Sequence, residues 1–156
     1  MTTRIGINGF GRIGRTYLRS ALAGGADVEV VAVNDLTDAG TLATLLEWDS
    51  VNGHFGGVAV EDDGLRVADR VIKVFSEPEP ARIPWGEVGA DVVIDATGFF
   101  TDREKAAEHL RGGARKVIVS APAKGDVPTF VLGVNDDRLD VSAADVFSNG
   151  SCTTNS

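Results

Sequence analysis

Short apolar runs alternate with helical patterns along the first part of the chain. Arg4–Asn8 has the alternating apolar side chains of a strand, and apolar residues at helical spacing follow from Ile13 to Leu22 and stop before Gly24. Val28–Val33 is a nearly continuous β-branched run, which is typical of a strand buried on both faces. The order strand, helix, strand indicates the beginning of a parallel α/β sheet.

The pattern changes over residues 55–75. Three short runs, Val58–Val60, Leu65–Val67 and Val71–Phe75, are separated by turn residues, with Asp62–Gly64 joining the first two. Such short runs with tight connections predict antiparallel strands rather than a crossover helix.

Parallel-sheet signals resume after a connection rich in proline. Gly112–Gly113 ends a helix that Thr101 or Asp102 is placed to cap, and His109 lies in that helix among charged neighbours, where we expect it to be solvated. Further strands are expected at Ala90–Ala96, Lys116–Ser120, Thr129–Val134 and Val146–Phe147. The whole pattern predicts the α/β class: a Rossmann-type doubly wound, mainly parallel sheet with a short antiparallel insertion.

Composition narrows the function classes. The 156 residues suffice for one domain with a real core, and the net charge of −8 argues against sequence-independent binding to nucleic acid or to an anionic membrane. No apolar run approaches the roughly 20 residues of a membrane helix, and the N-terminus lacks a secretory apolar region. Because the chain has a single cysteine, it forms no internal disulfide. We therefore expect a cytoplasmic protein without a metal site, a nucleic-acid partner or a membrane partner.

The segment GFGRIG matches the G-x-G-x-x-G pattern at the first strand-to-helix turn. Gly9 permits the tight turn, Gly11 lets a diphosphate approach the backbone, and Gly14 lets the helix pack closely on the strand. Asp35 ends the second strand, where a carboxylate can bind the adenosine ribose and repel a 2′-phosphate, and Leu36 offers no positive charge for that phosphate. These features favour NAD over NADP. The alternative is a structural turn, with Asp35 as a helix cap.

Cys152 stands among small polar residues directly after the last expected strand. A lone cysteine is commonly a small buried hydrophobe, but the flanking residues 148–151 and 153–155 are polar. If a helix begins near Ser151, its free N–H groups stabilise a thiolate at Cys152. Because loops after parallel strands gather at one sheet edge, the thiol is expected on the same side of the sheet as the glycine turn. A nucleophile next to a nicotinamide suggests aldehyde oxidation.

Together these blocks resemble the N-terminal half of the phosphorylating glyceraldehyde-3-phosphate dehydrogenase family. The resemblance rests on INGFGRIGR, VNDL, LLEWDSVNGHF, ATGFFT followed by EKA, GARKVIVSAPAK, PTFVLGVN and SNGSCTTN. It implies an NAD-binding Rossmann domain over residues 1–150, the start of a catalytic domain at 151–156, and a homotetramer for the full-length protein. It also implies glyceraldehyde 3-phosphate and inorganic phosphate as substrates, in glycolysis.

The resemblance also implies roles for individual residues, with Cys152 as the nucleophile. Ser151 and Thr153 would contact the substrate or the attacking phosphate. The turn backbone would contact the cofactor diphosphate at Gly9, Gly11, Arg12, Ile13 and Gly14. Asp35 would bind the adenosine ribose, and Thr97 and Ser120 would lie on the nicotinamide side of the pocket.

The chain departs from the family pattern at several positions. Pro78 stands where members often carry an arginine near the adenine, Gly150 replaces an alanine, and Ser156 replaces a second cysteine. The family's general-base histidine lies in the half that this chain lacks, and neither His54 nor His109 resembles a substitute, so the chain alone is expected to be inactive. Two alternatives remain: an erythrose-4-phosphate dehydrogenase, and a non-catalytic NAD-binding or interaction module.

Overall fold

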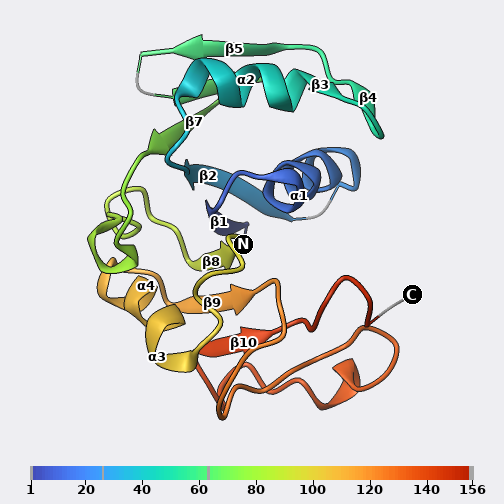
Figure 1. Cartoon of the computed structure of the whole chain (residues 1–156), viewed down its shortest axis with the longest axis vertical. Coiled ribbons are helices and arrows are strands. Elements are labelled where there is room, and N and C mark those ends of the chain that lie inside the picture. The colour runs from blue at the N-terminus through green and yellow to red at the C-terminus, as the bar shows by residue number, and fades with distance from the viewer. Residues whose placement is uncertain (1, 26, 63, 155–156) are drawn as a thin grey trace.

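A computed structural model describes residues 2–25, 27–62 and 64–154. In this part of the chain, one sheet has the strand order β10-β9-β8-β1-β2-β7-β6-β5 (Figure 1). Its parallel strands are β1 (Thr3–Asn8), β2 (Val28–Asn34), β7 (Arg70–Phe75), β8 (Val92–Asp95), β9 (Lys116–Val119) and β10 (Val146–Ser148).

The chain starts in the middle of this sheet and winds outwards in both directions. From β1 it proceeds to β2 and later β7 on one side, then returns to β8, β9 and β10 on the other. The antiparallel strands β5 (Val58–Glu61) and β6 (Gly64–Val67) extend the sheet beyond β7. The predicted doubly wound fold with an antiparallel insertion is confirmed. Part of its expected turn, Asp63, lies outside the described residues.

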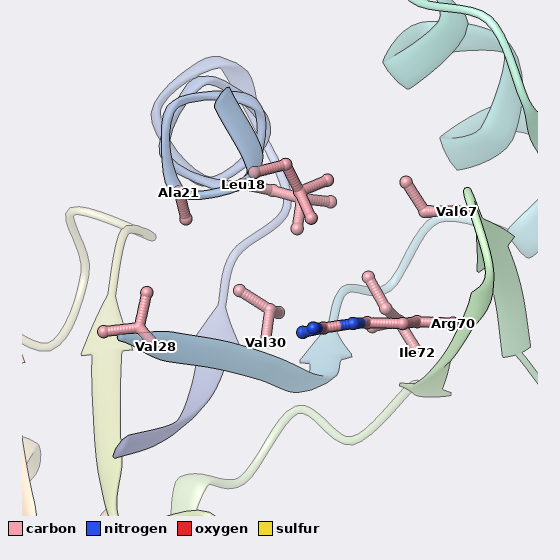
Figure 2. Close-up of a pocket in the computed structure, with 8 residues that line it drawn as sticks. Leu18, Ala21, Val28, Val30, Val67, Arg70 and Ile72 are labelled. Carbon is pink, nitrogen blue, oxygen red and sulfur yellow. The ribbon is translucent and has the colours of Figure 1, made fainter. Parts of the chain in front are cut away.

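Two helices cover one face of the sheet. They are α1 (Arg12–Ala23) and α2 (Ala39–Glu47), and the Asp38 side chain caps α2 by accepting from the Thr41 N–H at 2.9 Å. Figure 2 shows Leu18 and Ala21 of α1 facing Val28 and Val30 of β2 around a small apolar pocket, with Val67 of β6 and Arg70 and Ile72 of β7 at its side. This pocket belongs to the core packing and offers few polar groups to a ligand.

The opposite face is covered by shorter elements. These are the 3₁₀ turn η1 (Pro80–Arg82) and the helices α3 (Arg103–Ala106) and α4 (Glu108–Arg111). Trp85, fully buried, packs there with Ile83 and Val93, while Ala106 packs on Val117. A small antiparallel pair, β3 (Trp48–Asp49) and β4 (Gly53–His54), follows α2. None of the described helices is both long and apolar enough to cross a membrane.

The prediction of a strand over Thr129–Val134 is wrong. Only Thr129 makes an isolated bridge, to Ser148, and the residues after it form a turn in which the Val134 N–H donates to the Val131 carbonyl at 3.0 Å. Gly133 has φ +78° and breaks the extended backbone. The β9–β10 connection is therefore irregular apart from the 3₁₀ turn η2 (Asp136–Arg138).

The hydrogen-bond ladder continues beyond the carboxyl ends of the parallel strands. The Gly9 N–H donates to the Asn34 carbonyl at 2.8 Å, and the Ala96 N–H donates to the Asn8 carbonyl at 2.7 Å. The Ser120 N–H donates in the same way to Asp95, at 2.9 Å. The first residue after each of these strands is thus held by the neighbouring strand, which fixes the start of these three loops.

Candidate functional site

The junction of β1 with α1 accepts only glycine at two positions. Gly9 has φ +87°, and a Cβ there would stand 2.8 Å from the backbone nitrogen of Thr97. A Cβ on Gly14 would stand 2.4 Å from the Gly9 carbonyl oxygen. Gly14 therefore allows the close approach of α1 to β1 that the sequence predicts.

The N-terminus of α1 is open towards an anion. Gly11 is its N-cap, no side chain caps the helix, and its first turn contains no acidic residue. A Cβ on Gly11 would meet no atom within 4 Å, so the backbone at that point faces open space. Free N–H groups and the helix dipole together favour a phosphate group here.

Arg12 and Ile13 form the first turn of α1. The Arg12 side chain is directed to the small β3–β4 pair, where its guanidinium lies 3.5 Å from Asp49, and the Ile13 side chain is half exposed. Their backbone N–H groups, rather than their side chains, are therefore the groups available to a diphosphate.

Arg15 supports this turn from within. Its guanidinium donates to the Phe10 carbonyl at 2.8 Å. Burial lowers the pKa of Arg15 from its usual value, and the nearby carboxylate of Asp49 partly offsets that effect.

Asp35 joins the glycine turn to the loop after β2. Its carboxylate accepts the Phe10 N–H at 2.8 Å and the Thr37 N–H at 2.9 Å. Asp35 therefore holds the backbone of the glycine turn and of its own loop. The alternative interpretation of Asp35 as a helix cap is wrong, because Asp38 caps α2. Asp35 also lines a surface pocket, where a ribose hydroxyl can reach it.

That pocket lies along the carboxyl edge of the central strands. Its lining residues come from the loops after β1, β2, β7 and β8: Asn8, Gly9, Gly11, Asn34, Asp35, Leu36, Glu77, Pro78, Ala96, Thr97, Phe99 and Phe100. Of the residues predicted from sequence, Gly9, Gly11, Asp35 and Thr97 are thus brought together. Gly14 lies behind the turn, and Arg12, Ile13 and Ser120 flank the pocket without lining it.

Pro78, one of the departures from the family pattern expected from sequence, is in this wall. Its neighbours Glu77 and Glu79 add no positive charge, and the nearest arginine along the chain, Arg82, pairs with Glu79 at 3.0 Å.

Thr97 and Ser120 follow β8 and β9 at the same edge. The Thr97 hydroxyl donates to Asp95 at 2.7 Å and accepts the Phe99 N–H at 3.1 Å, so it is fixed by bonds on both sides. Ser120 is half-buried, and its backbone N–H is held by the Asp95 carbonyl.

Cys152 is exposed and follows the end of β10 by four residues. It is therefore not a buried hydrophobe, and it emerges from the same sheet edge as the glycine turn. The helix considered near Ser151 is absent from the described residues: residues 152–154 form a turn, closed by the Thr154 N–H donating to the Ser151 carbonyl at 3.0 Å. The proposed helix-dipole stabilisation of a thiolate has no basis in that geometry.

Hydroxyl groups surround this turn. Ser151 Oγ lies 2.7 Å from the Thr153 hydroxyl and accepts the Thr153 N–H at 3.1 Å. Gly150, with φ +78°, precedes them in a backbone conformation that favours glycine. Asn155 and Ser156, the end of the motif, lie outside the described residues.

The expectation that His109 is solvated is wrong, and the cluster around it was not predicted. His109 is fully buried and bonded to Asp95 and Trp85, instead of being solvated. One signal was available: His109 follows the buried Ala106 by three residues and therefore shares its face of the helical segment. Asn8 and Asn34, polar residues ending two apolar strands, complete the cluster. Among the described residues, no group of three or more His, Cys, Asp or Glu side chains is arranged to hold a metal ion.

The strand order, the glycine turn and the acid after β2 define a dinucleotide-binding domain of the doubly wound class. Residues 3–103 match the family described as glyceraldehyde 3-phosphate dehydrogenase, NAD binding domain, and the chain belongs to this family.

Curated relatives extend the match to the whole chain. The chain is 53% identical to glyceraldehyde-3-phosphate dehydrogenase 1 of Streptomyces avermitilis, over 99% of this chain and 47% of that protein. It is 54% identical to glyceraldehyde-3-phosphate dehydrogenase of Geobacillus stearothermophilus and 53% identical to glyceraldehyde-3-phosphate dehydrogenase 1 of Bacillus subtilis, covering 99% of this chain and 46% of each relative. The chain thus spans about half the length of the curated relatives that it matches.

Proposed function

We propose that this chain is the cofactor-binding, thiol-bearing half of a phosphorylating glyceraldehyde-3-phosphate dehydrogenase. The observation that carries the proposal is the shared sheet edge: the uncapped N-terminus of α1, the carboxylate of Asp35 and the exposed thiol of Cys152 all follow parallel strands there. A diphosphate, a ribose and a reacting carbonyl can each find a partner along this edge.

The cradle fits NAD. Gly9, Gly11 and Gly14 shape the turn, and the N–H groups of Arg12 and Ile13 face the diphosphate. Asp35 accepts from the ribose hydroxyls, and its negative charge disfavours a ribose carrying a 2′-phosphate. Thr97 and Ser120 lie on the nicotinamide side of the pocket.

Cys152 acts as the nucleophile. Its sulfur adds to the aldehyde carbon of glyceraldehyde 3-phosphate, and Ser151 and Thr153 contact the substrate or the attacking inorganic phosphate. NAD, when bound, would supply the hydride acceptor for oxidation of the sulfur adduct to a thioester. A phosphate oxygen then attacks the thioester carbon and releases the thiolate, yielding 1,3-bisphosphoglycerate.

The complete protein is proposed to be a cytoplasmic homotetramer acting in glycolysis. Residues 1–150 form its NAD-binding domain and residues 151–156 begin its catalytic domain, whose remainder supplies the general base. The alternative substrate, erythrose 4-phosphate, shares the aldehyde and the phosphate. The second alternative, an NAD-binding or interaction module without catalysis, uses the pocket but not the thiol.

Cofactor choice is tested by calorimetry on the purified chain with NAD and with NADP. We expect NAD to bind at least about tenfold more tightly, and Asp35→Asn to narrow that ratio, because the substitution removes the like charge but keeps an acceptor oxygen. Equal affinities for the two dinucleotides in the unsubstituted chain would contradict the role given to Asp35. Absence of any binding would contradict the NAD-binding proposal as a whole.

The thiol is tested by its rate of reaction with iodoacetamide at neutral pH, with a free cysteine peptide for comparison. A rate above that of the peptide, abolished in Cys152→Ser, supports the nucleophile, and a rate no greater than the peptide's favours the non-catalytic module. When a polypeptide supplying the second half is present, formation of NADH with glyceraldehyde 3-phosphate or erythrose 4-phosphate identifies the substrate.

A further inference from the structure

A buried polar cluster lies directly beneath the cofactor pocket. Asn8, Asn34, Asp95 and His109 are all at most 4% exposed, in a region where the neighbouring strands are apolar. Asp95 is the centre of the cluster, since both of its carboxylate oxygens accept hydrogen bonds. Buried polar groups are costly unless they are bonded, so the arrangement of these bonds is informative.

The proton on the His109 ring is placed by its neighbours. The indole N–H of Trp85 lies 3.0 Å from Nδ1 of His109 and can only donate, so Nδ1 accepts and carries no proton. The proton of the neutral ring is therefore on Nε2, which lies 3.0 Å from Oδ2 of Asp95 and donates to it.

Donors also surround the remaining acceptor positions of Asp95. Asn8 Nδ2 donates to Oδ2 at 2.9 Å, while the backbone N–H and the hydroxyl of Thr97 donate to Oδ1 at 3.1 and 2.7 Å. A carboxylate accepts at all these positions, whereas a carboxylic acid would direct its own proton at a donor. His109 thus supplies one of the bonds that hold a buried negative charge.

The cluster reaches both walls of the pocket. On one side, Asp95 holds Thr97, whose hydroxyl oxygen in turn accepts the Phe99 N–H. On the other side, Asn8 Oδ1 accepts from Asn34 at 2.8 Å. The Asn34 amide then pairs with the backbone of Glu77, accepting its N–H at 2.8 Å and donating to its carbonyl at 2.9 Å.

We propose that His109 is a positioning residue for the cofactor pocket, acting as the Nε2–H tautomer that orients Asp95 and, through Asp95, both pocket walls. The proposal rests on the proposed NAD-binding function and adds to it a residue that does not line the pocket. The contact of the His109 ring with Phe100, a lining residue, at 6.3 Å between ring centres gives a second route to the same wall.

A role in packing alone would predict a different result. A packing residue lowers the stability of the domain but leaves the folded molecules with an unchanged pocket. A positioning residue changes the affinity of the folded molecules, because loop geometry that was fixed before binding must then be fixed during binding.

Three substitutions separate the two roles. His109→Leu removes both ring nitrogens, and His109→Gln retains an amide that can donate to Asp95. Val117→Ala is the control, because Val117 is fully buried on β9 and belongs to a core cluster away from the pocket.

NAD affinity is measured by calorimetry at a temperature where all variants are folded. We expect His109→Leu to raise the Kd for NAD about tenfold, as for the loss of a hydrogen bond to a charged group. His109→Gln and Val117→Ala should stay within about twofold of the unsubstituted chain. A Kd for His109→Leu within twofold of the original, or an equal rise in Val117→Ala, overturns the positioning role while leaving NAD binding intact. If the unsubstituted chain does not bind NAD, the proposed function and this inference both fail.

A spectroscopic test stands even if His109→Leu does not fold. The chain has two histidines, so His54→Gln leaves His109 as the only source of imidazole signals in a ¹⁵N-histidine spectrum. We expect one slowly exchanging Nε2–H and an unprotonated Nδ1 at neutral pH, and a shift of the Nε2–H signal when NAD is added. A proton on Nδ1, or a signal that does not respond to bound NAD, overturns the proposal.

Discussion

Two alanine substitutions three residues apart separate folding from binding at the glycine turn. Gly14→Ala would place a methyl group 2.4 Å from the Gly9 carbonyl oxygen and 3.0 Å from the Ile7 side chain. Real Cβ atoms do not approach other atoms within 3.0 Å, so α1 must move away from β1 by about 0.6 Å, the difference between 3.0 and 2.4 Å. The Gly9 oxygen is a backbone atom and the position of a Cβ is fixed by its own backbone, so no side-chain rotation can relieve this contact.

The expected cost follows from that displacement. Overpacking of this kind costs about 1–3 kcal/mol, and the better helix propensity of alanine returns somewhat less than about 1 kcal/mol. A net loss of about 1–2 kcal/mol should lower the Tm by about 3–6 °C in a domain of this size. NAD affinity should fall as well, since the N-terminus of α1 moves with the helix.

Gly11→Ala should leave the stability of the domain nearly unchanged and should weaken NAD binding. Its methyl group would meet no atom within 4 Å, and the backbone at Gly11, with φ −72° and ψ −159°, is open to alanine. We expect the free energy of unfolding to change by less than about 1 kcal/mol, which is the loss of a favourable N-cap residue. The Kd for NAD should nevertheless rise at least about tenfold, because the methyl group occupies the space where the diphosphate approaches the backbone.

Thermal melts followed by circular dichroism and calorimetric titrations with NAD measure the two effects on the same samples. If Gly14→Ala melts at the temperature of the unsubstituted chain, the close approach of α1 to β1 is not needed. If Gly11→Ala lowers the Tm as much as Gly14→Ala, or binds NAD unchanged, the separate roles of the two glycines are refuted.

Two further predictions concern the domain outside the pocket. Leu18→Ala, at a side chain only 1% exposed beside the small apolar pocket of Figure 2, should lower the free energy of unfolding by about 3 kcal/mol in denaturant titrations, and a loss below about 1 kcal/mol would contradict its place in the core. The Thr41 backbone N–H and then the Thr41 hydroxyl lower the pKa of Asp38 from its usual 3.8, so the stability from this cap is present above that pH and is lost as the pH falls below it. An asparagine at this position caps the helix but does not titrate. The Tm of Asp38→Asn should therefore fall less between pH 5 and about pH 3 than the Tm of the unsubstituted chain. Equal decreases in Tm would show that titration of Asp38 does not weaken the cap.

Local sequence signals predicted the central part of the fold because each strand and helix there is marked by a pattern within its own segment of the chain. The strand at Val28–Asn34 is continuous and β-branched, and the glycine turn has a fixed spacing that reflects the contact of Gly14 with Gly9. Apolar content misled the prediction at Thr129–Val134. There Asn135 accepts the Val131 N–H at 2.7 Å and Gly133 reverses the chain, so local bonds replace a strand ladder.

The polar cluster was missed for a different reason. Its members are separated by up to 101 positions along the chain, and only the strand order brings Asn8 and His109 together. Neighbouring charges suggested solvent around His109, whereas the partner that explains its burial, Asp95, is on β8. Sequence patterns identify which face an element buries, but they do not pair polar side chains across elements.

The ladder bonds made by Gly9, Ala96 and Ser120 tie the binding edge to the sheet itself. Opening this edge breaks the last ladder bonds between β1 and β2, between β8 and β1, and between β9 and β8. Occupancy of the pocket should consequently protect the whole domain against heat and proteases, with NAD at a hundredfold excess over its Kd adding about 2.7 kcal/mol. Amide hydrogen exchange at these three positions should slow in step with exchange in the central strands.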